Sequence, residues 1–289
     1  CVILSSFFIS YDLQKLLNLG LAFLLGLLSH AIAIVLGLLL FRNTAGNLYR
    51  VQRFALVFSN CGFMAIPIIS AVLGSEGIFY ASGFLTAHHI LNWSYGIYLV
   101  TIDGKAAKTD VICPPGRYAA LKYRYENFSL RHPLIKCVVN PAIISVVLGL
   151  IIFLLQIPIA LPLQNAISSL GSMNTPLSMI ILGGLIAQSD LKNGIRDKKV
   201  YFLCFLRLLF IPAIMLLALW IIPAAPIIKM ANIIATACPT AATVSIFSAK
   251  YLKANREVDF ASHTVMLTTL LSLITMPMVT SVAGMIFGL

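Results

Sequence analysis

The sequence predicts an all-α protein that crosses a membrane many times, and three observations carry that prediction. Of its 289 residues 60% are hydrophobic and only 10% are charged, whereas a soluble domain has about 25% charged residues. Eight apolar stretches are long enough to cross the hydrocarbon core of a bilayer, which takes roughly 20 residues. The connections between these stretches alternate between basic and non-basic, as in multi-pass membrane proteins.

The predicted spans follow one another along the whole chain. Residues 1–8 are typical of the end of a helix that is cut within its span. Because the sequence has no initial Met, we expect a first helix and part of the second to be missing. The predicted spans are 16–41, 54–73, 78–102, 133–155, 162–187, 200–222, 226–249 and 260–287.

The distribution of charge predicts the orientation in the membrane. Sixteen of the 20 Lys and Arg residues lie in four connections, which alternate with connections at 9–15, 74–77, 156–161 and 223–225 that hold only Lys15. The positive-inside rule places the basic connections in the cytoplasm and the C-terminus outside the cell membrane. The net charge of +11 is therefore explained by membrane topology, and we predict no nucleic-acid partner.

Two of the predicted spans are interrupted at membrane depth, where every backbone polar group must be satisfied by protein or by a water-filled cavity. The first interruption contains Asn60, Gly62 and Pro67, and the second contains Cys238, Pro239 and Thr240. Two interruptions at corresponding positions of two halves are typical of a transporter binding site.

The interrupted spans also occupy matching places in two sets of three. The set 16–102 begins outside and ends inside, whereas the set 200–287 begins inside and ends outside, which is an inverted repeat. Between the two sets lie a basic linker loop at 103–132 and two spans, 133–155 and 162–187, that we expect to be unbroken. Symmetry then predicts ten spans in the complete protein.

The residues at the interruptions predict an anion site. Each outgoing half-helix starts near the membrane centre with unpaired N–H groups and a partial positive charge, which bind anions. Asn60 either caps the freed backbone or contacts the ligand. Gly62 has no side chain and lets the backbone approach the ligand closely. Thr240 offers a hydroxyl donor. Cys61 and Cys238 lie in the same segments, although small apolar packing is an equally simple interpretation of membrane cysteines.

Polar side chains elsewhere in the spans provide further candidates. His88, Asn92 and His263 are predicted to contact the substrate, since polar and ionisable groups within the membrane are usually functional. Serine and threonine in these spans more often join helices together. Arg207 lies eight residues from the cytoplasmic edge and is expected to extend its side chain towards that edge.

Several kinds of chemistry find no support in the sequence. All nine acidic residues lie in loops or at span edges, which disfavours a carboxylate relay, while sodium on backbone carbonyls and a proton on His stay open. Metalloprotease, serine hydrolase and Walker motifs are absent. We therefore predict no catalytic residue, no metal site and no cofactor.

Four stretches together resemble the auxin efflux carrier family, which includes bacterial malate and malonate permease-like proteins. The stretches are Asn60-Cys-Gly-Phe-Met-Ala-Ile-Pro67, Asn140-Pro-Ala-Ile-Ile, Thr175-Pro-Leu-Ser-Met-Ile-Ile-Leu-Gly-Gly184, and Cys238-Pro-Thr-Ala-Ala-Thr followed by Ala249-Lys-Tyr251. The resemblance covers essentially the whole chain. The linker 103–132 is short compared with that of the plant plasma-membrane exporters, which favours a prokaryotic-type carrier.

The resemblance implies a ten-helix inverted-repeat fold related to the bile-acid/sodium symporters. It implies that the two broken helices cross at the substrate site, and that a transport domain (16–102 and 200–287) moves against a scaffold (1–8 and 133–187). The expected function is alternating-access transport, elevator-like, of a small organic anion such as a carboxylate. A sodium-coupled symporter of the bile-acid type and a channel are the alternatives. The expected partners are the anion and membrane lipid, and a homodimer stays open.

Overall fold

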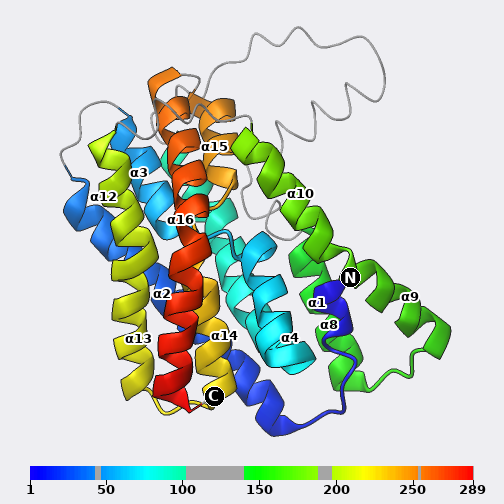
Figure 1. The fold of residues 1–289 in the computed structure, drawn as a ribbon. Helices are drawn as coiled ribbons and strands as arrows, with labels where there is room; N and C mark the ends of the chain where they lie inside the picture. Colours follow the sequence, from blue (N-terminus) through cyan, green and yellow to red (C-terminus); the bar gives the residue numbers. More distant parts are fainter. Residues whose placement is uncertain (43–46, 102–139, 188–196, 253–254, 289) are drawn as a thin grey trace, which may run out of the picture.

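The computed structural model describes all residues except 43–46, 102–139, 188–196, 253–254 and 289. Its described part is helical, with one isolated bridge between extended residues (Figure 1). Among the described residues, four helical stretches are long and apolar enough to cross a membrane, namely Leu13–Leu40, Cys61–Thr101, Lys198–Ile221 and Arg256–Phe287. This confirms the predicted all-α polytopic membrane protein.

The predicted spans correspond to helices, several of which are divided into shorter pieces. Segments labelled η are π-helical turns that directly precede or follow an α-helix. In chain order the elements are α1 (Val2–Ser5), α2 (Leu13–Leu40), α3 (Leu48–Val57), η1 (Cys61–Ala65), α4 (Ile66–Leu91), η2 (Asn92–Gly96), α5 (Ile97–Thr101), α8 (Pro141–Leu155), α9 (Leu161–Ser172), α10 (Asn174–Ala187), α12 (Lys198–Phe205), η3 (Leu206–Phe210), α13 (Ile211–Ile221), α14 (Pro226–Ala237), α15 (Thr243–Phe247), η4 (Ser248–Leu252) and α16 (Asn255–Phe287).

Both predicted interruptions are present as gaps between helices. α3 ends at Val57 because Phe58 is extended, and helical structure resumes with η1. α14 ends at Ala237, and α15 begins at Thr243. Gly74 adopts a left-handed backbone conformation (φ 64°) that kinks α4 within the predicted connection 74–77.

The prediction of an unbroken span at 162–187 was wrong. α9 ends at Ser172 and α10 starts at Asn174, so the span consists of two helices at an angle to each other (Figure 1). Pro176 explains the break, since it has no N–H to donate to the carbonyl of Ser172, four residues earlier, where α9 ends. The predicted linker 103–132 and residues 133–139 of the preceding span lie outside the described residues.

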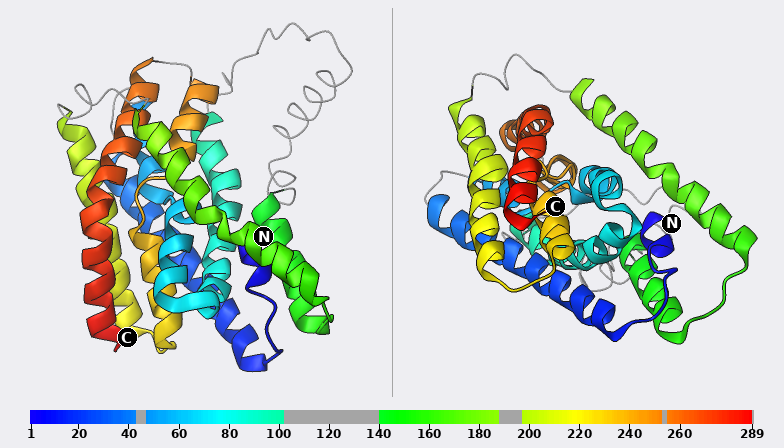
Figure 2. Two further views of the ribbon diagram at one scale, coloured as in Figure 1. Left: turned by 45° about the vertical axis from the view of Figure 1, so that its right-hand side comes forward. Right: turned by 60° about the horizontal axis from the view of Figure 1, so that its bottom comes forward.

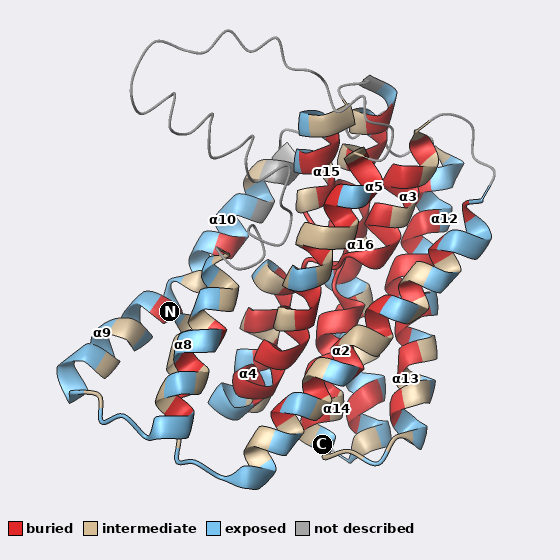
Figure 3. Ribbon diagram, turned by 180° about the vertical axis from the view of Figure 1, so that it is seen from behind, coloured by how far each residue is buried: buried red, intermediate tan, exposed pale blue. Residues whose placement is uncertain are grey.

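The helices are arranged as a bundle with a smaller group beside it. α4 packs against α2 and α14, and α14 packs against α16. α1, α8, α9 and α10 lie together on one side of this bundle (Figure 2). Buried residues concentrate inside the bundle, while α9 and α10 are largely exposed (Figure 3). Large apolar side chains on the outer faces, such as Ile221 and Met285, suit contact with lipid.

Candidate functional site

The two gaps between half-helices meet in space. Ser59 and Thr240 form an isolated antiparallel bridge, in which Asn60 N donates to the Pro239 carbonyl at 2.7 Å and Ala241 N donates to the Phe58 carbonyl at 2.9 Å. We call residues 58–60 and 238–242 the crossing. Each gap thus supplies the hydrogen-bond partners that the other lacks, which satisfies exposed backbone at membrane depth.

Arg207 lies against the crossing and not towards a membrane edge. Its side chain is 2% exposed, and its guanidinium donates to the carbonyls of Leu56 (3.0 Å), Thr236 (3.0 Å) and Cys238 (3.3 Å). The prediction that Arg207 extends to the cytoplasmic edge was therefore wrong. The carbonyl ends of α3 and α14 outweigh the edge as partners, because a cation is stabilised at a helix C-terminus.

Thr240 also serves the carbonyl end of α3. It is fully buried, its hydroxyl donates to the Ala55 carbonyl at 3.1 Å, and its backbone N–H donates to the Thr268 hydroxyl at 3.2 Å. The hydroxyl of Thr240 is therefore already used within the protein. Its contribution is to hold the two broken helices together.

The start of η1 differs from these carbonyl ends because it presents unused donors. Asn60 is 3% exposed, its side chain makes no capping hydrogen bond, and its amide Nδ2 has no partner. The structure therefore contains no support for the interpretation that Asn60 caps the freed backbone. A Cβ added to Gly62 would meet nothing within 4 Å, so the first turn of η1 borders open space. The first N–H groups of a helix lack intrahelical partners.

The remaining predicted residues of the two interruptions are two cysteines, which are buried, and two prolines, which occupy different places. Cys61 and Cys238 are fully buried, and Cys238 Sγ donates to the Ile234 carbonyl at 3.4 Å, which fits the packing interpretation. Pro239 lies in the crossing itself. Pro67 lies beyond it, in the first turn of α4, where π-helical structure gives way to α-helix.

Two of the three predicted polar side chains reach the surroundings of the crossing. Asn92 accepts a hydrogen bond from Thr243, the first residue of α15, at 3.5 Å. His88 shares a 3.1 Å hydrogen bond with His30, and both rings pack against Phe58. The histidine pair is thus adjacent to the crossing, although sequence analysis did not pair His30 with His88.

His263 is placed elsewhere. It lines a separate hollow with charged side chains near the beginning of α12 and α16; the other residues of this hollow are Leu48, Asp197, Lys199, Arg256, Asp259 and Phe260. Thr268, which follows His263 on α16, does reach the crossing, because its hydroxyl accepts the backbone N–H of Thr240.

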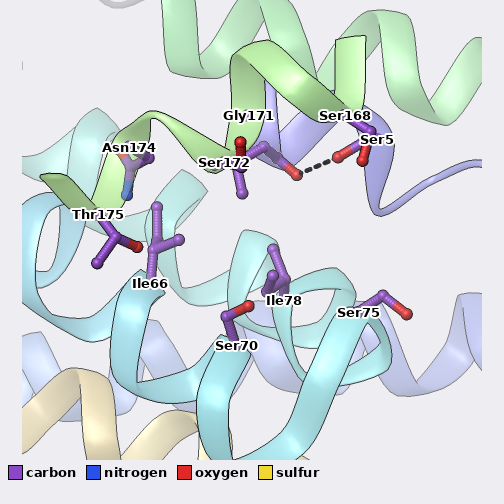
Figure 4. A pocket seen from close by; sticks show the side chains of 11 residues that line it. Ser5, Ile66, Ser70, Ser75, Ile78, Ser168, Gly171, Ser172, Asn174 and Thr175 are labelled. Atoms are coloured by element: carbon purple, nitrogen blue, oxygen red, sulfur yellow. Dashed lines mark hydrogen bonds between the residues drawn. The ribbon is translucent and has the colours of Figure 1, made fainter. Parts of the chain in front are cut away.

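A cavity of about 230 Å³ lies between α4 on one side and α1, α9 and α10 on the other (Figure 4). Uncharged hydroxyl and amide groups dominate its polar lining, namely Ser5, Ser70, Ser75, Ser168, Ser172, Asn174 and Thr175. None of these residues was predicted as a site, because single serines in membrane helices are common. The cavity therefore lies at part of the boundary between the bundle, represented by α4, and the smaller group of helices beside it.

Within the described residues, no cluster of three or more His, Cys, Asp or Glu side chains could hold a metal ion. Comparison with known families finds one model, described as a membrane transport protein, that matches residues 1–280. No curated protein matches the sequence.

Proposed function

The chain belongs to the auxin efflux carrier family of membrane transport proteins, and we propose that it is a secondary carrier of a small organic anion. It is a multi-pass membrane protein whose family performs transport. The proposal adds the class of substrate, its place at the crossing and alternating access as the mechanism. It also adds the orientation, with the basic connections in the cytoplasm of the cell.

The unpartnered amide of Asn60 is the observation that carries the proposal. A buried N–H donor without an acceptor is costly, so a ligand that supplies an oxygen there is favoured. Arg207 and Thr240 occupy the carbonyls of Leu56 and Ala55, and backbone N–H groups occupy those of Phe58 and Pro239. The amide of Asn60, in contrast, is a donor without a partner. A carboxylate accepts such hydrogen bonds and is also favoured by the partial positive charge at the start of η1.

The arrangement of the helices supports an elevator-like movement. In this proposal the transport domain (16–102 and 200–287) slides against the scaffold (1–8 and 133–187). Two features favour it: α1, α8, α9 and α10 are grouped beside the bundle (Figure 2), and the hydroxyl-lined cavity lies between them and α4. Hydroxyl groups would let this contact rearrange without breaking charge pairs.

Uptake into proteoliposomes tests the transport function. We expect saturable accumulation of at least one of malate, malonate and indole-3-acetate by the purified protein. A flux that rises linearly with concentration would instead favour a channel. Replacement of sodium by choline separates a sodium symporter, whose uptake would collapse, from the carrier proposed here.

Substitution of Asn60 tests the site. Asn60→Ala removes a hydrogen bond to a charged group, worth about 1.5–3 kcal/mol, so we expect uptake below saturation to fall about tenfold to a hundredfold. The control is Asn232→Ala, a fully buried amide on α14 that donates to its own helix at Ile228 and lacks a partner only for its oxygen. Uptake by Asn60→Ala that equals wild type for every accepted anion would reject the role of Asn60.

A further inference from the structure

Arg207 is a buried cation with an unusual set of partners. It is the second residue of η3, the π-helical turn that joins α12 to α13. Its guanidinium donates to three backbone carbonyls, which lie at the ends of two other helices. Leu56 belongs to the last turn of α3, while Thr236 and Cys238 lie at the end of α14.

These carbonyls belong to the ends of half-helices that carry partial negative charge. In transporters with broken helices, such ends and the neighbouring unwound carbonyls coordinate sodium ions or protons. In this protein the guanidinium already occupies them. A guanidinium has five N–H donors in a fixed fork and keeps its charge, so it can hold both helix ends at once.

The positive charge of Arg207 lacks a counter-charge in the described part of the chain. Carbonyl oxygens solvate the guanidinium but leave its net charge in place, and its contacts there include no carboxylate. Of the acidic side chains that the structure describes, Glu76 follows the kink of α4 at Gly74, and the others lie near the start of a helix, namely Asp12, Asp197, Glu257 and Asp259. A buried charge without an opposite partner is costly, so an anion nearby would be stabilised.

A short chain of contacts joins Arg207 to the open donors of the crossing. Its Nε binds the carbonyl of Cys238, and the carbonyl of the next residue, Pro239, accepts the backbone N–H of Asn60. The guanidinium is therefore held close to Asn60 without being directed at the open space beside Gly62. Its effect on a ligand there is electrostatic and does not require contact.

We propose that Arg207 is the fixed cation of the anion site. It takes the place that a coupling cation would occupy at the half-helix ends, and it supplies the counter-charge for the bound carboxylate. This rests on the proposed transport of an organic anion at the crossing. Arg207 is a positioning residue, and uptake requires no sodium because the guanidinium already neutralises the partial negative charge of the carbonyls of Leu56, Thr236 and Cys238.

Kinetics of uptake in proteoliposomes test the proposal, with malate, malonate and indole-3-acetate as probes. The variants are Arg207→Gln, which keeps hydrogen-bond donors without the charge, and Arg207→Lys, which keeps the charge without the fork. Lys229→Gln is the matched control, because it removes one positive charge from α14, where Lys229 Nζ lies 5.5 Å from the Phe287 ring. Each variant is also compared for helical content and thermal unfolding.

A charge effect predicts a distinct pattern in KM. Arg207→Gln raises the KM of the accepted anion at least about tenfold, Arg207→Lys keeps it within about threefold while unfolding at a lower temperature, and Lys229→Gln leaves it unchanged. Wild-type uptake is equal in sodium and in choline. Should Arg207→Gln fail to fold, Arg207→Lys decides, since a purely steric role of the fork would raise its KM about tenfold.

Three results would overturn the role of Arg207. An unchanged KM in a folded Arg207→Gln, with loss of stability alone, would make the residue structural. Wild-type uptake that falls about tenfold without sodium would mean that a sodium ion shares the helix ends. If the wild-type protein accumulates none of the three anions, the proposed function itself is rejected, and the role of Arg207 falls with it.

Discussion

At the scale of single residues, the crossing separates acceptors from donors. The carbonyls at the ends of α3 and α14 accept hydrogen bonds from Arg207, from Thr240 and from backbone N–H groups of the other gap. The buried amide of Asn60 is left as a donor without a partner, and the first turn of η1 borders open space at Gly62. In the proposed function, this asymmetry favours anions without a mobile basic side chain.

Gly62→Ala should reduce transport without harming the fold. A Cβ at Gly62 would meet nothing within 4 Å, and Gly→Ala in a helix stabilises a protein by about 0.4–1 kcal/mol. If the anion approaches this backbone, the added methyl group displaces it, and KM should rise several-fold in uptake assays while the unfolding temperature is kept. Gly20→Ala in α2, where a Cβ also meets nothing, should leave KM unchanged and should keep or slightly raise the unfolding temperature.

Thr240→Val should loosen the crossing itself. The change keeps the shape of the side chain but removes the hydroxyl that binds the Ala55 carbonyl, so we expect a loss of about 1 kcal/mol in unfolding free energy. Thr280→Val in α16 is the control, because the Thr280 hydroxyl is buried without a partner and its removal should be neutral or slightly stabilising. Equal unfolding temperatures of the two variants would contradict the joining role of Thr240.

The sequence predicted the positions of the breaks but not their partners. Asn60, Pro239 and their neighbours disrupt helix locally, so a local pattern was sufficient to place them. The contacts of Arg207 are with residues 29 and 151 positions away, and no local pattern specifies such contacts. For the same reason His30 was not paired with His88, and the separate location of His263 could not be anticipated.

At the scale of elements, close packing between α2 and α4 supports the broken helix. A Cβ on Gly83 would lie 2.8 Å from the Leu19 carbonyl oxygen and 2.9 Å from Phe23 N, so the two backbones touch there. Small residues allow such approach between membrane helices, where apolar side chains gain little by leaving lipid.

Gly83→Ala should therefore destabilise the protein. The new methyl group would have to push α2 away from α4, and overpacking of this kind costs about 1–3 kcal/mol. Thermal unfolding in detergent measures the effect. Gly183→Ala in α10, where an added Cβ meets nothing within 4 Å, should keep or slightly raise the unfolding temperature. A similar shift in both variants would show that helix propensity and not packing determines the result.

The extent of the elements could largely be predicted, because runs of apolar residues mark membrane spans. The division of these elements into shorter helices and turns could not be predicted. The π-helical turns η1, η2, η3 and η4 carry no composition signal of their own, and the bend between α9 and α10 required weighing Pro176 against an otherwise apolar run. Tertiary packing decides whether a proline bends a membrane helix or is accommodated, as Pro277 is within α16.

At the scale of the whole molecule, composition and hydropathy were sufficient to predict the class of an all-α polytopic membrane protein. They could not define how the helices group, since grouping depends on contacts between distant segments. α1, α8, α9 and α10 stand beside the bundle, and the cavity at α4 lies where the proposed scaffold and transport domain meet (Figure 4).

Cross-linking across this cavity tests the proposed movement. Ser70 and Ser172 line it from opposite groups of helices, so a Ser70→Cys/Ser172→Cys pair joined by a short, cleavable thiol reagent should stop uptake, and reduction should restore it. The control pair Ser5→Cys/Ser168→Cys lies within the proposed scaffold and should keep its activity after treatment. Full activity of the joined Ser70/Ser172 pair would contradict a sliding transport domain.

The proposed transport function depends most on the place where the anion binds. An experimental structure of the protein with the anion that it transports measures this directly. We predict density for a carboxylate within hydrogen-bond distance, about 3 Å, of Asn60 Nδ2 and beside the backbone of Gly62, with Arg207 still on its three carbonyls. Density in the hydroxyl-lined cavity or in the hollow at His263, with the crossing empty, would contradict the account.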